Sequence, residues 1–298
     1  MTDLRFRDLH TLDEFRAVVA LEQQIWGYED ASDIFTVPVF IITVKRGAIL
    51  IGAVDARDRL VGFTYSLVGM KDGRPLQWSH MTGVLPEYQG TGLGYRLKLA
   101  QRERALAAGF DLIEWTFDPL QALNAHFNFA KLGTVADEYA DNVYGESSSA
   151  LHRGTPTDRL IAQWRIGAPH VERRLAVTGA GTLRSRDVAE APVVNATVVH
   201  GAWRQNATID LAIEDRRIWV EIPTGFTEMQ QQAPDLALQW RLQAREIFHA
   251  YLGRGYQVVD FLLDRSEGRG RYLLATEGAG AGAAGGASPS GAARRLLP

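Results

Sequence analysis

Strand-like and helix-like patterns of apolar and polar positions alternate along the first part of the chain. Residues 4–9 alternate with the period of a β-strand, and apolar residues then recur at helical spacing over residues 10–27. Residues 48–70 contain two β-rich runs around the polar turn 55–59, which predicts a hairpin. A further strand is predicted over residues 75–86.

The next stretch continues as helix, strand, helix and two strands. Residues 93–109 predict a helix that stops at a glycine, and residues 111–117 follow as a strand. That strand is too apolar to be half-exposed, so we expect a buried parallel neighbour. A second helix is predicted to end at Gly133, before strand-like runs at residues 135–145 and 157–166. The order predicts a mixed α/β sheet.

The second half of the chain repeats parts of the first. The string GFDLIEW (109–115) shares its pattern with GYQVVDF (255–261), and LKLAQRE (97–103) resembles WRLQARE (240–246). An ancient internal duplication explains these similarities, and convergence of two α/β units is the alternative; we favour the duplication. The second copy has one glycine where the first has a run of three.

The length and the composition of the C-terminus suggest the domain boundaries. A chain of 298 residues exceeds the usual size of one domain, so we expect domains at residues 1–167 and 168–275. Residues 276–298 are rich in Ala, Gly and Ser and offer little apolar area to offset the entropy of ordering. We therefore expect them to form a disordered tail.

The composition is that of an ordinary globular protein and narrows the chemistry. The net charge of −3 gives no electrostatic reason to expect nucleic acid or an anionic membrane as partner. The absence of cysteine excludes disulfides, thiolate nucleophiles and cysteine-based zinc sites, and we expect no metal. The N-terminus lacks the apolar core of a signal peptide, and Lys45 and Arg46 interrupt the longest apolar run. We expect a cytoplasmic protein.

A run of glycines lies between the strand at residues 75–86 and the helix that follows it. Gly90, Gly92 and Gly94 occupy every second position there. A turn of small residues leading into a helix exposes backbone N–H groups at the positive end of the helix dipole, which suits a phosphate or pyrophosphate. The spacing fits neither a nucleotide P-loop nor a dinucleotide-binding turn, because Leu97 stands where the latter needs a glycine.

The surrounding residues suggest a family. Gln89, Gly92 and Gly94 match the motif Q/R-x-x-G-x-G/A, the string VLPEY (84–88) precedes it, and KLG (131–133) follows downstream. In these features the sequence resembles the GNAT superfamily of acyl-CoA-dependent acyltransferases. The resemblance covers residues 3–166 and implies an N-terminal GNAT fold with splayed parallel strands. The duplication then implies a second, degenerate GNAT-like α/β domain.

The resemblance implies that acetyl-CoA or another acyl-CoA is the co-substrate. The strands at residues 80–84 and 111–117 are expected to splay apart and admit the pantetheine arm. Backbone groups of Gly83 and Val84 would pair with its amides and polarise the thioester carbonyl, and Asn124 resembles the asparagine that family members direct at this arm. The pyrophosphate would be held by the loop residues Gln89, Gly90, Thr91, Gly92, Leu93 and Gly94.

The acid–base groups are less clearly marked. Many family members place a tyrosine acid where this chain has Phe129, so the usual acid is absent. Tyr144 is the nearest chemical substitute, with strand packing as the alternative explanation of that residue. His80 on the cofactor strand is the candidate base, because its ordinary pKa lies near 6.5; a buried histidine satisfied by hydrogen bonds is the alternative.

Two carboxylates are candidates for recognition of the acceptor ammonium. Asp118 ends the second splayed strand, although an aspartate before proline is also an ordinary turn signal. Glu221 holds the matching strand position of the second copy, where a solvated strand carboxylate is the alternative.

Together these residues predict an acyl-CoA-dependent N-acyltransferase. We expect it to transfer an acetyl group, or a larger group such as succinyl, to a small amine such as an amino acid by direct attack on the thioester. A non-catalytic acyl-CoA sensor is the alternative that Phe129 suggests. Protein acetylation is a third reading, for which the sequence shows no charged docking run. The oligomeric state is left open, a homodimer included.

Overall fold

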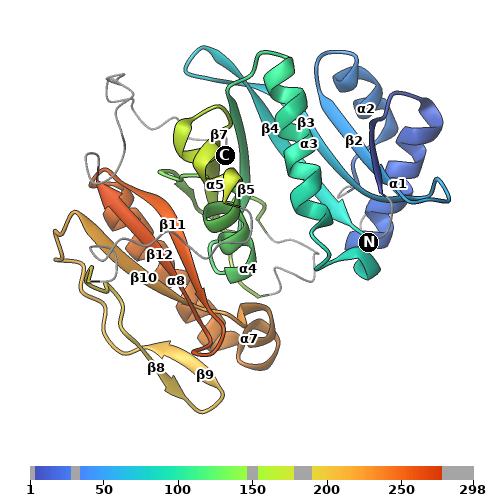
Figure 1. Ribbon diagram of the computed structural model, residues 1–298. Helices are drawn as coiled ribbons and strands as arrows, with labels where there is room; N and C mark the ends of the chain where they lie inside the picture. The colour runs from blue at the N-terminus through green and yellow to red at the C-terminus, as the bar shows by residue number, and fades with distance from the viewer. Residues whose placement is uncertain (1–3, 28–33, 146–153, 178–189, 277–298) are drawn as a thin grey trace.

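A seven-stranded mixed sheet forms the first half of the protein in the computed structural model, which describes residues 4–27, 34–145, 154–177 and 190–276 (Figure 1). Its strands lie in the order β1 (Arg5–Asp8), β2 (Ile49–Val54), β3 (Leu60–Lys71), β4 (Arg74–Val84), β5 (Leu112–Phe117), β7 (Arg159–Arg165) and β6 (Tyr139–Ala140). All neighbouring pairs are antiparallel except β4 and β5. The predicted hairpin and the predicted parallel pair are confirmed.

Helices cover both faces of this sheet. They are α1 (Leu12–Trp26), α2 (Val37–Val44), α3 (Leu93–Ala107), α4 (Ala122–Ala125) and α5 (Pro169–Ala176), with a 3₁₀ turn η2 (Pro86–Tyr88) and a π-helix η3 (His126–Leu132). Successive side chains of a strand point to opposite faces. In β3, Phe63 contacts Trp26 of α1, whereas Gly62 faces Leu97 of α3. The helices α1 and α3 therefore lie on opposite faces.

Two helical segments differ from the sequence pattern. Residues 37–44, for which the sequence pattern predicts no helix, form α2, in which Phe40 is buried while Ile41 and Ile42 are exposed. The helix predicted to end at Gly133 does end there, with that glycine at φ 73°, but its last seven residues form a π-helix. Such short π segments occur frequently at functional sites.

The parallel strands β4 and β5 form a fork. They pair only through Gln77 with Ile113 and Trp78 with Glu114, and beyond these residues the two strands are no longer paired. A β-bulge follows directly, because Ser66 of β3 pairs with Ser79 while Tyr65 pairs with Met81. His80 is thus the extra residue of the bulge, a feature that bends a strand and redirects a side chain.

The second half is a smaller α/β unit beside the β5–β7 end of the sheet (Figure 1). It comprises β8 (Thr197–His200), β9 (Trp203–Asn206), β10 (Arg217–Pro223), α7 (Phe226–Gln232), α8 (Pro234–Leu252), β11 (Tyr256–Asp264) and β12 (Arg269–Thr276). It has the strand–helix–strand order that the duplication predicts. However, β12 lies between β10 and β11 and pairs antiparallel with both. The two parallel strands are therefore not adjacent, and no fork forms between them.

The two halves share one hydrophobic core. Ala136 and Val258 of β11 exchange backbone hydrogen bonds of 3.0 and 2.7 Å. Phe129 lies 5.8 Å from both Phe117 and Tyr272, ring centroid to centroid, so the core continues from β5 to β12. The predicted domain boundary at residue 167 stays a prediction.

Two further expectations concern the ends and the apolar helices. The tail was predicted over residues 276–298; Thr276 instead ends β12, and residues 277–298 lie outside the described residues. Within the part of the chain that the structure describes, none of the helices combines the length and the apolar character needed to cross a membrane.

Candidate functional site

The loop between β4 and α3 presents a row of unengaged backbone amides. None of the amides from Gly90 to Tyr95 donates a hydrogen bond of normal geometry to a described residue. The first turn of α3 closes through the Arg96 amide, which donates to Gly92 O at 3.1 Å. The leading amides of a helix lack intrahelical partners and lie at its positive end. An anion at the start of α3 could therefore use these donors without displacing a backbone hydrogen bond of normal geometry.

The space in front of these amides is open. Gly90 and Gly92 have φ values of 74° and 85°, which favour glycine, and a Cβ built on either would meet no atom within 4 Å. Gly94 has an ordinary helical φ, and a Cβ there would also contact nothing. The fold itself does not require a glycine at position 94. The absence of a side chain there leaves open space on the outside of the helix.

Other predicted loop residues serve the loop itself. The amide of Gln89 is engaged with Pro86 O at 3.1 Å, so the prediction that this amide holds an anion is wrong; its side chain donates to Val84 O at 3.2 Å. The Thr91 hydroxyl donates to Tyr88 O at 2.6 Å. The side chain of Leu93 is buried in the core and anchors the start of α3.

Gly83 lies where β4 packs against the end of α1. A Cβ at this residue would lie 2.8 Å from Ile25 and 2.9 Å from Trp26, so a larger residue would force these two side chains to shift. Val84 follows as the last residue of β4 and pairs with Gly62 of β3. These two residues end the arm of the fork that leads into the amide row.

His80 lies in the bulge on the face that carries α1 and α2. Its ring is 5.2 Å from that of Phe35 and 6.3 Å from that of Tyr65, centroid to centroid. The side chain reaches the surface, and the atoms packed around it lower its pKa by desolvation. A neutral imidazole is therefore favoured at neutral pH, as a proton acceptor requires.

Glu22 of α1 is a buried carboxylate near this histidine that the sequence analysis missed. It accepts a hydrogen bond from the Phe35 amide at 3.1 Å, while its other oxygen, Oε2, has no partner among the described residues. Burial raises the pKa of Glu22 to about 7, against the smaller effect of that hydrogen bond. In the sequence, Glu22 resembles an ordinary polar residue of an amphipathic helix, so no local signal identified it as a site residue.

Tyr144 lies at the other arm of the fork. Its hydroxyl is 3.1 Å from Oγ1 of Thr116 in β5, and 53% of the residue is exposed. Because Trp115 contacts Lys98 of α3, the neighbouring Thr116 points to the opposite face, where α1 and α2 lie. His80 and Tyr144 thus flank the fork on one face of the sheet.

Phe129 is fully buried and offers no acid chemistry. The nearest tyrosine across its ring, Tyr272, donates its hydroxyl to Pro119 O at 2.6 Å, and burial raises the pKa of Tyr272 well above its usual range. Asn124 lies exposed on α4, and no hydrogen bond or ion pair joins its side chain to the residues that the structure describes. In the π-helix, Asn128 is buried, and its amide nitrogen has no partner in the described part of the chain.

Asp118 does not face an acceptor cleft. Its carboxylate is buried and accepts two hydrogen bonds from Arg241 of α8, at 2.8 and 2.6 Å. The prediction that Asp118 recognises a substrate ammonium is therefore wrong, because the protein's own guanidinium occupies both oxygens.

Glu221 is likewise an internal partner. It is buried in β10, where Arg269 and Arg271 donate to Oε1 at 3.2 and 2.8 Å and Thr197 donates to Oε2. The prediction that Glu221 reaches the acceptor is wrong for the same reason.

Lys98 on the buried face of α3 is another residue that the sequence analysis missed. Its Nζ donates to Ser79 Oγ at 3.0 Å and to Gln101 Oε1 at 2.8 Å, and it lies 3.7 Å from the centre of the Trp115 ring. Desolvation lowers the pKa of Lys98 to about 7. The helical pattern treats a lysine as solvent-facing, so its burial became visible only in the fold.

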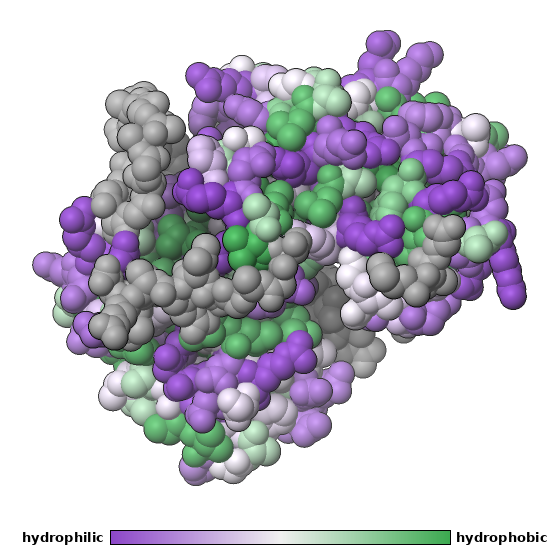
Figure 2. All heavy atoms as spheres, in the orientation of Figure 1, coloured by the Kyte–Doolittle hydropathy of each residue, from purple (hydrophilic) through white to green (hydrophobic). Residues whose placement is uncertain are grey.

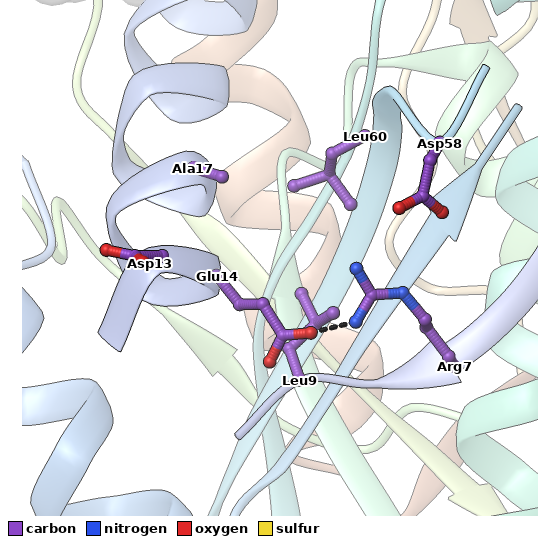
Figure 3. A pocket seen from close by; sticks show the side chains of 7 residues that line it. All are labelled: Arg7, Leu9, Asp13, Glu14, Ala17, Asp58 and Leu60. Atoms are coloured by element: carbon purple, nitrogen blue, oxygen red, sulfur yellow. Dashed lines mark hydrogen bonds and ion pairs between the residues drawn. The ribbon is translucent and has the colours of Figure 1, made fainter. Parts of the chain in front are cut away.

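The surface also has a hollow elsewhere. Figure 3 shows it between β1, α1 and the β2–β3 turn, with Arg7 turned toward Glu14 in an ion pair and Asp58 on its rim. None of the predicted site residues lines it. Figure 2 shows mainly polar side chains on the face seen in Figure 1, with apolar side chains exposed in its middle. Among the described residues no group of three or more His, Asp or Glu side chains is arranged to hold a metal ion.

Comparison with known proteins gave structural matches alone. No protein-family model matches the chain, and no curated protein sequence does. An acetyltransferase of the GNAT family from Desulfovibrio desulfuricans is 15% identical, with 55% of this chain and 99% of that chain covered and a TM-score of 0.43. The ribosomal-protein-S18-alanine N-acetyltransferase from Escherichia coli is 15% identical, with coverages of 56% and 96% and a TM-score of 0.45.

A third match is to part of a larger protein. The glucosamine N-acetyltransferase region of a fungal multi-domain β-N-acetylglucosaminidase is 22% identical, with a TM-score of 0.34; the match covers 39% of this chain and only 14% of that one. The strand order, the fork between β4 and β5 and the amide row at the start of α3 agree with the arrangement that the resemblance to the GNAT superfamily implies for the first half of the chain.

Proposed function

We propose that the protein is an acyl-CoA-dependent N-acyltransferase. The observation that carries the proposal is the row of six unengaged amides from Gly90 to Tyr95, in open space at the start of a 15-residue helix. These amides suit the pyrophosphate of coenzyme A. Because the row directly follows β4, a pantetheine arm attached to that pyrophosphate can enter the fork between β4 and β5.

The fork supplies what the arm and the thioester need. Beyond Trp78 and Glu114 the facing backbone groups of β4 and β5 are free of mutual pairing. Backbone N–H groups of β4 near the bulge can then bind the pantetheine amides and polarise the thioester carbonyl. The developing oxyanion is thereby stabilised without any metal ligand from the chain.

The acceptor amine would approach on the face that holds His80 and Tyr144. His80 accepts a proton from the ammonium, directly or through water, and the neutral nitrogen attacks the thioester carbon. The carbon–sulfur bond then breaks as the amide forms, and the nitrogen loses its second proton. The leaving thiolate takes a proton from the Tyr144 hydroxyl, which lies beside Thr116 of β5 and recovers a proton from the nitrogen through solvent. The products are an N-acyl amine and free CoA.

The finer assignments extend this proposal. We expect an acetyl or a larger acyl group such as succinyl, and a small amine such as an amino acid as acceptor. The acceptor carboxylates expected from sequence are engaged internally, and Glu22 is an ionisable residue near His80 on the face that the acceptor would approach.

A non-catalytic acyl-CoA sensor is the second candidate. The observation that favours it is Phe129, which is buried in the position of the usual acid and packs between Phe117 and Tyr272. A sensor needs the amide row and the fork but no proton donor.

Calorimetric titration with CoA, followed by a thiol-release assay with acetyl-CoA over a panel of small amines, tests both candidates. If the protein is an N-acyltransferase, it should bind CoA and release thiol with at least one amine. Binding without release on every amine supports the sensor. Absence of CoA binding contradicts both.

A further inference from the structure

Lys98 lies at the point where the fork opens. The last backbone pair of β4 and β5 is Trp78 with Glu114, and the next residue on each strand is Ser79 and Trp115. The Lys98 ammonium contacts both, at 3.0 Å from Ser79 Oγ and 3.7 Å from the Trp115 ring centre. A cation on α3 therefore bridges the two arms at the closed end of the space between them.

This cation has no anionic partner among the described residues. Its hydrogen-bond acceptors, the hydroxyl of Ser79 and the side-chain carbonyl of Gln101, are neutral, and the side chain is only 2% exposed. Transfer of an ammonium from water to such a place is unfavourable unless an anion or a good set of hydrogen bonds compensates. The burial accordingly lowers its pKa to about 7. An anion that reached the cluster would favour the charged lysine.

The charged and titratable groups near Lys98 do not serve as its counter-ion. Glu114 of β5 is paired with Lys71 at 2.6 Å. His80 follows Ser79 but lies with Phe35 on the opposite face. On α3 itself, Arg102 donates to Ile166 O and pairs with Glu172. None of these groups forms an ion pair with Lys98.

The distances match a short dicarboxylic acyl chain. Met81, the first residue after the bulge, lies two residues beyond Ser79, which is at most ~7 Å along a strand and less across the bulge at His80. A four-carbon chain spans ~5 Å from the thioester carbon to its terminal carboxylate, and a charge-assisted hydrogen bond adds ~3 Å. A thioester bound beside Met81 can therefore direct a terminal carboxylate to the Lys98 ammonium.

We propose that Lys98 makes the protein select acyl-CoA thioesters whose acyl chain ends in a carboxylate, of which succinyl-CoA is the simplest of matching length. The inference rests on the proposed function, since it needs the thioester in the fork. Lys98 acts here through a non-covalent ion pair: its ammonium donates to the carboxylate, and Ser79 and Gln101 hold the ammonium in place. No bond to the lysine forms or breaks.

Binding measurements test this without knowledge of the acceptor. The full chain is titrated with CoA, with butyryl-CoA and with succinyl-CoA, whose chains have the same four carbons with and without a terminal charge. We expect succinyl-CoA to bind at least about tenfold more tightly than butyryl-CoA at pH 6, the gain of one charge-assisted hydrogen bond. This ratio of affinities should fall at pH 8.5, because the binding of succinyl-CoA must then protonate the lysine.

Lys98→Met and Lys98→Gln should reduce the succinyl-to-butyryl preference to about one, while Lys45→Met, which removes an exposed lysine on the other face, should retain it. CoA binding by the variants shows that they are folded. An equal affinity of the wild type for the two acyl-CoAs, or a preference that survives in both Lys98 variants, would overturn the inference and leave the proposed function standing. Failure of the wild type to bind CoA at all would instead count against the proposed function.

Discussion

The guanidinium of Arg241 in α8 donates two hydrogen bonds to the Asp118 carboxylate at the end of β5, at 2.8 and 2.6 Å, with both side chains buried. The pair joins residues 123 positions apart and fixes the second half of the chain against the open end of the fork. Arg241 also lies over the ring of Phe226, 5.1 Å from its centre. The pair is thus a structural link between the halves.

Asp118→Asn should destabilise the protein by about 3–5 kcal/mol, because it leaves a buried guanidinium without its counter-ion. Urea unfolding measures the loss. Asp8→Asn is the control, since Asp8 pairs with Arg104 near the surface and should cost less than about 1 kcal/mol. Equal effects of the two substitutions would contradict a structural role for Asp118.

Gly94→Asp should separate stability from ligand binding. An acidic residue in the first turn of α3 interacts favourably with the helix dipole and has a better helix propensity than glycine, so the melting temperature should not fall. The same carboxylate would face the pyrophosphate and should weaken CoA binding at least about tenfold. Calorimetry and thermal melting on one sample measure both effects.

Gly92→Asp and Gly73→Asp form a matched pair for the same question. Both glycines have positive φ, 85° and 76°, and neither has an atom near its missing Cβ, so the backbone cost of the substitution is similar. Gly73 lies in the turn between β3 and β4, far from the amide row. Loss of CoA binding in both variants would point to general strain and against the assigned site.

His80→Ala should lower the thiol-release rate by about 10²–10⁴-fold while CoA still binds, if the histidine accepts the proton of the amine. The pKa of His80 is lowered by desolvation, so with rising pH the wild-type rate should reach half of its plateau below pH 6.5, as the imidazole becomes neutral. The control is His200→Ala on the exposed strand β8. A full rate in His80→Ala would remove the histidine from the mechanism.

Glu22→Gln should change how stability depends on pH. The pKa of Glu22 is raised to about 7, so between its unfolded value near 4.5 and pH 7 the folded state binds the extra proton. Stability therefore falls as pH rises through this window, and the neutral variant should escape the loss and gain up to about 3 kcal/mol at pH 8. Urea unfolding at pH 5 and pH 8 measures this, with the exposed Glu103→Gln as control.

The local elements were within reach of the sequence because their signals lie within a few residues. The helix α1 begins at the capping box of Thr11 and Glu14 and ends at Gly27 in the left-handed conformation. The turn between β2 and β3 closes through the Asp55 amide and Arg59 O, where the polar run predicted it. The glycine run likewise predicted the amide row, because tolerance of positive φ and the lack of a side chain are local properties of glycine.

The tertiary structure decided the features that depend on distant partners. Periodicity gives which face of a helix is apolar, but the burial of Lys98 and Glu22 follows from how α3 and α1 dock on the sheet. Asp118 and Glu221 looked available for substrate because their arginine partners lie far along the chain, at Arg241, Arg269 and Arg271. The place of β12 between β10 and β11 arises in the same way, since strand pairing joins segments whose separation no local pattern encodes.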